Sequence, residues 1–166
     1  MDNWVCYLIM SLDSKETYIG STNNRQRRLN DHNNLNPSRK GAKRTRGRTW
    51  IPILYISGFE NKNACLSFES GWKRLSKKRN IQRLLLINEI SNIKLNYNND
   101  PKWNRIMDLL YFVHNITFIG TKFKLNSDVK HPVILPENLF IEIMNEDWIT
   151  ELSWPYFINT YMISFD

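Results

Sequence analysis

Cysteine is scarce in this chain, and its distribution excludes two classes of protein. The 166 residues contain two cysteines, Cys6 and Cys65, and residues 66–166 contain none. No Cys/His cluster has zinc-site spacing, and one pair of thiols is too few for a disulfide-stapled secreted domain. Both cysteines stand among apolar residues, which predicts two buried free thiols in a reducing, intracellular compartment.

Long apolar runs and a leader segment are also missing. No stretch approaches the ~18 consecutive apolar residues that a membrane span needs. The first residues show no charged, apolar and small-residue succession of the kind that marks a signal peptide. Hydrophobic residues nevertheless make up 42% of the chain, which is enough for the core of one domain, or of one domain with an appendage. We therefore expect a globular protein with no membrane partner.

Acidic residues are few in the first half of the chain, and this asymmetry indicates a polyanionic partner. Residues 1–79 hold 16 Lys and Arg against 6 Asp and Glu, whereas residues 80–166 hold 7 against 10. A concentrated positive field attracts polyanions and speeds their encounter with the protein. Nucleic acid is the favoured partner, because the basic stretches are not cleanly amphipathic as membrane-surface helices are.

Residues 1–79 have the pattern β-β-α-β-α. Strands are expected over residues 5–10, 17–21 and 50–56 from their short β-branched and aromatic runs, with Pro52 indicating a sheet edge or a bulge. Helices are expected over residues 25–33 and from the Asn61 cap through Leu75. The predicted class is α/β (α+β), with a small, mostly antiparallel three-stranded sheet flanked by helices.

The basic run over residues 73–79 marks a domain boundary or an extended helix, and we divide the chain into 1–79 and 80–166. The second part is expected to be a mostly helical extension with a structural or interaction role. It would contain a packing helix over 81–90, a helix beginning at Pro101, and a strand over 116–125. The apolar stripe of the second helix would be Met107, Leu109, Leu110 and Val113.

Five residues of the first part have side chains suited to phosphodiester chemistry. Arg28 and His32 are four apart, so they share one helix face and could address one phosphate. Tyr7 and Tyr18 lie on neighbouring expected strands, where they are either core residues or site residues. Glu69 is the one carboxylate of the expected helix after Asn61, where it could hold a hard cation such as Mg²⁺ or pair with a nearby basic side chain.

Two basic segments could contact a phosphate backbone without reading its sequence. One is the loop over residues 39–48, which has six basic residues and no acid, and the other is the run over residues 73–79. A charged run is otherwise a solvated face or a localisation signal. The candidate DNA-binding residues are Arg25, Arg27, Arg39, Lys40, Lys43, Arg44, Arg46, Arg48, Lys73, Lys77, Lys78 and Arg79.

The ordered motifs of the first part resemble those of a known family. Val5-Cys6-Tyr7 and Tyr18-Ile19-Gly20 look like the paired signatures of GIY-YIG nucleases. The segment from Arg27 to Asn33 resembles the family's arginine-and-histidine helix, and Phe68-Glu69 with Trp72 resembles its metal-binding glutamate helix. Gly20 belongs to this motif, although a plain β-bulge glycine would look the same.

The similarity is closest to the Slx-type branch of structure-specific endonucleases. Its further counterparts here are Cys6-Tyr7-Leu8, His32-Asn33, Lys43-Arg44-Thr45 and Gly58-Phe59. Val5 replaces the first glycine of the signature. The branch's cysteine-rich zinc module has no counterpart in residues 66–166, so docking of the branch's usual scaffold through that module is not implied, and a homodimer or a scaffold protein partner stays open.

The resemblance implies a DNA endonuclease of repair or recombination that uses one Mg²⁺ or Mn²⁺ ion. It would hydrolyse flaps, forks or Holliday junctions, leave 3′-hydroxyl and 5′-phosphate ends, and work in the nucleus or at a site of viral DNA replication. Tyr7 would deprotonate the attacking water, and Tyr18 would position water or phosphate. Two alternatives remain: a nuclease acting on ordinary or damaged duplex, and a non-catalytic module that binds nucleic acid.

Overall fold

The computed structural model describes residues 3–33, 45, 47–89, 100–132 and 138–163. Their elements, in chain order, are β1 Val5–Ser11, β2 Thr17–Thr22, α1 Arg25–His32, β3 Trp50–Ser57, α2 Lys62–Glu89, α3 Pro101–His114, β4 Ile116–Ile119, β5 Lys122–Leu125, the 3₁₀ turn η2 Asn126–Asp128, β6 Leu139–Met144, α4 Asp147–Thr150 and β7 Ile158–Ile163. The pattern β-β-α-β-α is confirmed over the first part. No described helix is long and apolar enough to cross a membrane.

The main sheet has five strands, so the expectation of three was wrong. Its order is β2-β1-β3-β6-β7, and all neighbours are antiparallel except the parallel pair β6 and β7. Of the two alternatives for Pro52, a sheet edge or a bulge, the second is correct, because Pro52 lies at a register shift between β3 and β1. The segment Leu54–Ser57 remains free to pair with β6, and the second half of the chain therefore completes the sheet.

The second half of the chain also contains strands outside the main sheet, although a mostly helical extension was expected there. The expected strand over 116–125 is the hairpin β4–β5, which turns near Gly120, whose φ is +64°. That left-handed backbone favours glycine. The mostly helical description of residues 80–166 therefore needs correction, since β4 to β7 lie there beside α3 and α4.

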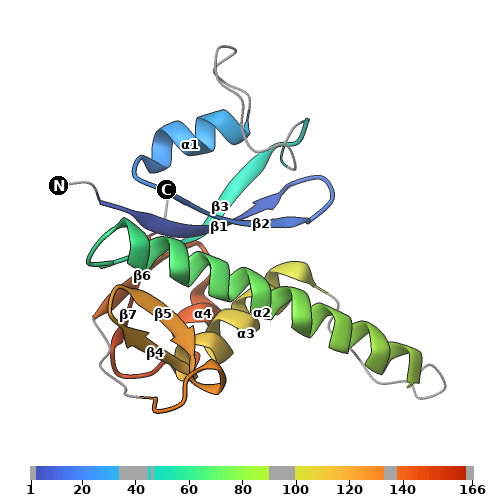
Figure 1. The fold of residues 1–166 in the computed structure, drawn as a ribbon. Coiled ribbons are helices and arrows are strands. Elements are labelled where there is room, and N and C mark those ends of the chain that lie inside the picture. The colour runs from blue at the N-terminus through green and yellow to red at the C-terminus, as the bar shows by residue number, and fades with distance from the viewer. Residues whose placement is uncertain (1–2, 34–44, 46, 90–99, 133–137, 164–166) are drawn as a thin grey trace.

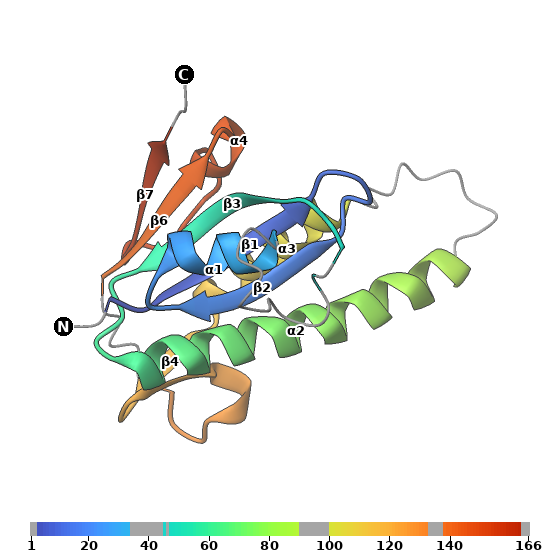
Figure 2. The same cartoon turned by 90° about the horizontal axis from the view of Figure 1, so that it is seen from above.

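Helix α2 extends without interruption past the basic run, so the extended-helix alternative is the correct one. Its far end is not the expected packing helix, because Ile81, Leu84 and Leu85 are more than half exposed. Figure 2 shows this end projecting beyond the sheet. The division into 1–79 and 80–166 stays a prediction.

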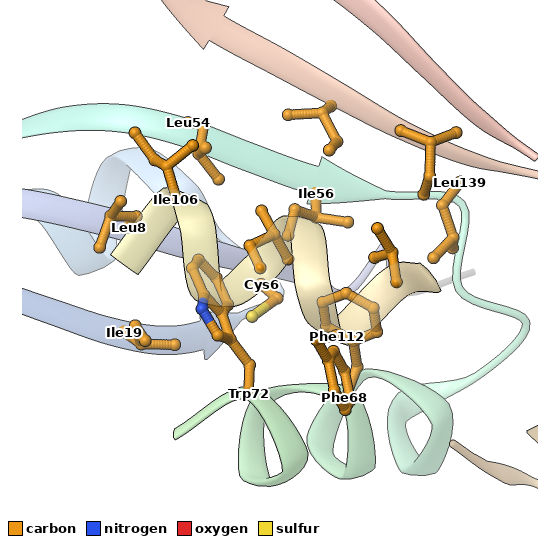
Figure 3. Packing of buried hydrophobic residues seen from close by; sticks show 14 of the residues in the cluster. Cys6, Leu8, Ile19, Leu54, Ile56, Phe68, Trp72, Ile106, Phe112 and Leu139 are labelled. Carbon is orange, nitrogen blue, oxygen red and sulfur yellow. The ribbon is translucent and has the colours of Figure 1, made fainter. Parts of the chain in front are cut away.

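One hydrophobic core joins the two parts of the chain and fixes α2 against the sheet. Phe68 of α2 packs against Phe112 of α3, and Trp72 lies one turn further along α2. These three residues lie beneath Leu8 and Ile56 of the sheet, and all five are fully buried (Figure 3). The expected stripe of α3 is confirmed at Leu109 and Val113, while Met107 and Leu110 are only partly buried. The complete stripe adds Ile106 and Phe112. The two cysteines are buried and free, as expected.

Candidate active site

The two tyrosines of the signature motifs lie on the sheet face that α1 covers. In the register of β1 with β2, Tyr7 pairs with Gly20 and Ile9 pairs with Tyr18. The ring centroids of Tyr7 and Tyr18 are 6.3 Å apart. A Cβ at position 20 would lie 2.4 Å from the Tyr7 hydroxyl oxygen, so Gly20 is required by the close approach of this ring.

Helix α1 brings Arg28 and His32 over the tyrosines. Its first turn is capped by the Asn24 side chain, which accepts a hydrogen bond from the backbone N–H of Arg27. His32 Nε2 lies 2.7 Å from the Tyr7 hydroxyl oxygen, and Nδ1 lies 2.8 Å from Oγ1 of Thr45. His32 is 1% exposed. Two hydrogen bonds therefore hold its ring in a fixed orientation.

Burial and the Arg28 charge set the protonation of this cluster. Burial raises the pKa of Tyr7 well above its usual value, although a hydrogen bond with Arg28 works in the opposite direction. Burial and the charge of Arg28 lower the pKa of His32 to about 4. Burial alone would lower the pKa of Arg28, but its interactions with Tyr7 and Tyr18 outweigh that effect and raise it. Near pH 7 the cluster holds a neutral phenol, a neutral imidazole and a fixed cation.

Glu69 reaches the same region from α2, on the opposite side of the edge strand β2. Its Oε2 accepts a hydrogen bond of 2.9 Å from Ser21 Oγ, and its Oε1 lies 3.1 Å from Lys73 Nζ. Lys73 also stands 5.1 Å from the centre of the Tyr18 ring. The carboxylate of Glu69 contributes to the raised pKa of Tyr7, so its charge acts on the tyrosine cluster. The five candidate residues thus converge at β2.

The donor set at Glu69 fits a hard cation that takes most of its ligands from solvent and substrate. Among the described residues, no three His, Cys, Asp or Glu side chains gather as metal ligands, which disfavours a zinc-type cage. Mg²⁺ and Mn²⁺ accept a single protein carboxylate together with water and phosphate oxygens. Glu69 side-chain exposure is 16%, and both of its oxygens face polar partners, so a cation could replace Lys73 there.

Several candidate DNA-binding residues are engaged inside the protein. Arg25 lies 2.5 Å from Glu142 of β6 and covers the Tyr55 ring. Arg79 contacts the buried Asp108 at 3.0 Å. Lys73 pairs with Glu69, and Arg48 pairs with Glu16. The exposed candidates are Arg27, Lys77 and Lys78. The remaining candidates lie outside the described residues: Arg39, Lys40, Lys43, Arg44 and Arg46.

Two positioning residues were not assigned from the sequence. Ser21 binds Glu69, and its only signal was its place directly after the Tyr18-Ile19-Gly20 motif. Thr45 holds His32 from 13 residues away, and its side chain is buried beside Trp50, whose indole N–H donates to the Thr45 carbonyl. Thr45 belonged to a motif of the resemblance, but a contact at such sequence distance has no local pattern.

Comparison with known proteins assigns a family to the segment that contains these residues. Residues 3–82 match the GIY-YIG catalytic domain. The structure-specific endonuclease subunit slx1 of Pyrenophora tritici-repentis is 41% identical over 83 residues, which cover 48% of this chain and 22% of that protein. The Vanderwaltozyma polyspora subunit SLX1 is 45% identical over 74 residues, covering 42% and 23%, and the Candida glabrata subunit is 39% identical over 85 residues, covering 49% and 27%.

The chain spans about a quarter of the length of these relatives, and the matched region is the one that holds Tyr7, Tyr18, Arg28, His32 and Glu69. The strands and helices of this region were expected from local sequence patterns, and the roles of its candidate side chains from the resemblance. The chain therefore carries, over residues 3–82, a catalytic domain of the GIY-YIG nuclease family.

Proposed function

We propose that this protein is a structure-specific endonuclease that hydrolyses phosphodiester bonds in branched DNA during repair or recombination. The observation that carries the proposal is the convergence of Tyr7, Tyr18, Arg28, His32 and Glu69 at the edge strand β2. Preference for branched DNA is supported by the similarity to subunits of structure-specific endonucleases. Such an enzyme would act in the nucleus or wherever viral DNA is replicated.

Tyr7 is the proposed general base for the attacking water. Its phenol is the resting form, because burial raises its pKa, and ionisation requires a neighbouring positive charge. Arg28 supplies that charge through its hydrogen bond with Tyr7, and the phenolic proton would leave along the hydrogen bond to Nε2 of the neutral His32 ring before the oxygen accepts a proton from water. The hydrogen bond between Tyr7 and the neutral His32 ring fixes the phenolic oxygen, so its orientation toward a bound water is set before substrate arrives.

Arg28 and Tyr18 are the proposed contacts to the scissile phosphate. A guanidinium is permanently charged and presents a planar fork of donors that suits phosphate oxygens. Arg28 interacts with both tyrosines, so a phosphate bound to it would lie beside the base. Negative charge that develops on the phosphate is then opposed by a preorganised cation.

Glu69 is the proposed holder of one Mg²⁺ or Mn²⁺ ion, in keeping with the general use of a divalent metal by GIY-YIG nucleases. A bound ion would act as a Lewis acid and stabilise the charge of the leaving oxygen. Ser21 orients the Glu69 carboxylate through its hydrogen bond, and Lys73 keeps that carboxylate paired when no ion is bound.

The test is a cleavage panel of flap, fork, four-way junction and linear duplex substrates with added Mg²⁺. We expect the wild-type chain to cleave branched substrates faster than duplex. Glu69→Gln should lose cleavage by at least about 100-fold while it retains binding, because a neutral amide cannot replace a metal-binding carboxylate. Glu60→Gln is the matched control, since Glu60 is exposed and lies just before α2.

Each other outcome contradicts a defined part of the proposal. Cleavage that survives in Glu69→Gln would overturn the metal assignment. Equal rates on junction and duplex would favour a nuclease of ordinary or damaged duplex. Salt-sensitive binding without cleavage by the wild-type chain in either Mg²⁺ or Mn²⁺ would favour a non-catalytic module that binds nucleic acid.

A further inference from the structure

A polar groove lies beside α2 on the side away from β1 and β2. Its volume is about 620 Å³, and residues of α2 and β5 line it. Figures 1 and 2 both place the β4–β5 hairpin across α2 from the β1–β2 pair. The polar side chains that line the groove are Asn63, Ser67, Ser70, Arg74, Lys122, Lys124 and Asp128. Its β5 wall lies outside the matched catalytic domain, which ends at residue 82.

A second hollow of about 230 Å³ continues the groove along α2. It shares Arg74 and Asp128 with the first and adds Lys78. Four cations, Arg74, Lys78, Lys122 and Lys124, therefore line the combined surface against one carboxylate, Asp128. Within the described part of the chain, none of these four cations has a carboxylate partner. The combined surface, which we call the α2–β5 groove, is strongly positive.

The wall made by β5 is fixed in place by the core. Alternation along the strand points Phe123 inward and leaves Lys122 and Lys124 exposed on the outer face. The ring of Phe123 packs 5.5 Å from that of Phe68, and its backbone N–H donates a 2.9 Å hydrogen bond to Ser67 Oγ. The two lysines are therefore held at a set position relative to α2.

The α2–β5 groove and Glu69 occupy different sides of the same helix. At about 100° per residue, Arg74 lies roughly 140° around α2 from Glu69. Lys73 and Lys77 occupy the surface between these two positions, at roughly 40° and 80° from Glu69. A band of cations thus leads from the carboxylate at β2 to the groove. Two nucleic-acid segments meeting at α2 could each follow one side of it.

We propose that the α2–β5 groove binds the sugar-phosphate backbone of a second arm of branched DNA, while the scissile strand occupies the site at Glu69. This inference rests on the proposed function. Lysine and arginine supply the attraction to phosphate, and the groove also offers hydroxyl and amide groups that bond phosphate oxygens without reading base sequence. Recognition would then come from the divergence of two arms around α2.

The experiment compares binding, not cleavage, so it stands apart from the test of nuclease activity. Lys122→Glu and Lys124→Glu are introduced together into the Glu69→Gln chain, and affinity for a flap, a four-way junction and a linear duplex is measured by fluorescence anisotropy at several salt concentrations. We expect branched-DNA affinity to fall about 10- to 100-fold. The slope of log affinity against log salt concentration should become less steep, by the amount that corresponds to the loss of about two phosphate contacts. Duplex affinity should change less than about twofold.

The charge-matched control is Lys15→Glu with Lys130→Glu, two exposed lysines outside the groove, and thermal unfolding confirms that all variants fold. Unchanged junction affinity in the groove variant would overturn the inference. An equal loss on duplex and junction, or an equal loss in the control, would also overturn it, because either result assigns the effect to general charge. Failure of the wild-type chain to cleave would contradict the proposed function and leave this comparison intact.

Discussion

The hydroxyl oxygen of Tyr7 and Nε2 of His32 lie 2.7 Å apart, so a buried hydrogen bond joins β1 to α1. The opposite ring nitrogen, Nδ1, is bound to Thr45. His32 is therefore satisfied on both sides only as long as its ring can accept one hydrogen bond and donate the other. A protonated ring has two N–H donors and no acceptor, which makes this contact sensitive to pH.

We expect the free energy of unfolding to fall as the pH decreases from about 6.5 to 4. The unfolded chain binds a proton at His32 with an ordinary pKa, whereas the folded pKa is lowered to about 4. Between these values the unfolded state binds more protons, so stability from this group is complete above pH 6.5 and is lost at lower pH. The loss amounts to up to about 3 kcal/mol. Urea unfolding at pH 4.5, 5.5 and 7 measures it.

The control replaces each of two histidines by glutamine. His32→Gln should flatten the slope between pH 4.5 and 7, while His131→Gln should leave it unchanged, because His131 is exposed. An identical slope in His32→Gln and the wild-type chain would contradict the link between burial of His32 and pH-dependent stability.

Gly20→Ala should reduce cleavage by at least about tenfold and destabilise the fold by about 1–3 kcal/mol. The added Cβ would lie 2.4 Å from the Tyr7 hydroxyl oxygen and 2.9 Å from the Tyr18 ring, so both tyrosines must move. Cleavage kinetics and urea unfolding are measured on the same preparation. Wild-type kinetics in a folded Gly20→Ala chain would show that the exact positions of the rings do not matter.

Asp108→Asn should destabilise the protein by about 3–5 kcal/mol. Its carboxylate is fully buried and lies 3.0 Å from Arg79, 2.5 Å from Arg83 and 3.2 Å from Arg105. The neutral amide would leave three guanidiniums around α2 and α3 without their countercharge. Chemical denaturation checks the effect, and exposed Asp13→Asn is the control, with an expected change within about 0.5 kcal/mol. Equal stability of the two variants would refute a structural role for this cluster.

The fragment of residues 1–79 should be poorly soluble and inactive. Removal of residues 80–166 would take away Ile106 and Phe112, which bury Phe68 and Trp72, and would leave β3 without β6. The fragment's oligomeric state, near-ultraviolet circular dichroism and cleavage of a junction measure the outcome. A monomeric fragment with full activity would contradict this prediction, and the full chain is the control.

The elements that could be predicted from sequence are those with a local signal. Short β-branched and aromatic runs located β1 and β2, and Pro101 located the start of α3. The pairing of β3 with β6 could not be predicted, because it depends on a contact between residues more than 80 positions apart. Pro52 indicated a sheet edge or a bulge, and the register shift beside it in the sheet decides for the bulge.

The candidate site was predicted to the extent that its residues belong to motifs with fixed spacing. The spacing of Arg28 and His32 placed them on one helix face, and the structure brings both to Tyr7. The pairing of Arg25 with Glu142 had no sequence signal, since the two residues lie 117 positions apart. Basic residues in a sequence do not reveal which of them remain available for a ligand until their acidic neighbours are known.

The ion pairs between the two parts of the chain change what its net charge means for a polyanion. Glu142 neutralises Arg25, and Asp108 neutralises part of the charge of Arg79, Arg83 and Arg105. Part of the acidic excess of the second half is thus paired with arginines within the protein. The first half therefore has fewer cations available to bind a polyanion than its composition indicates. Counterion release on binding DNA should accordingly report the smaller number of cations that remain at the surface.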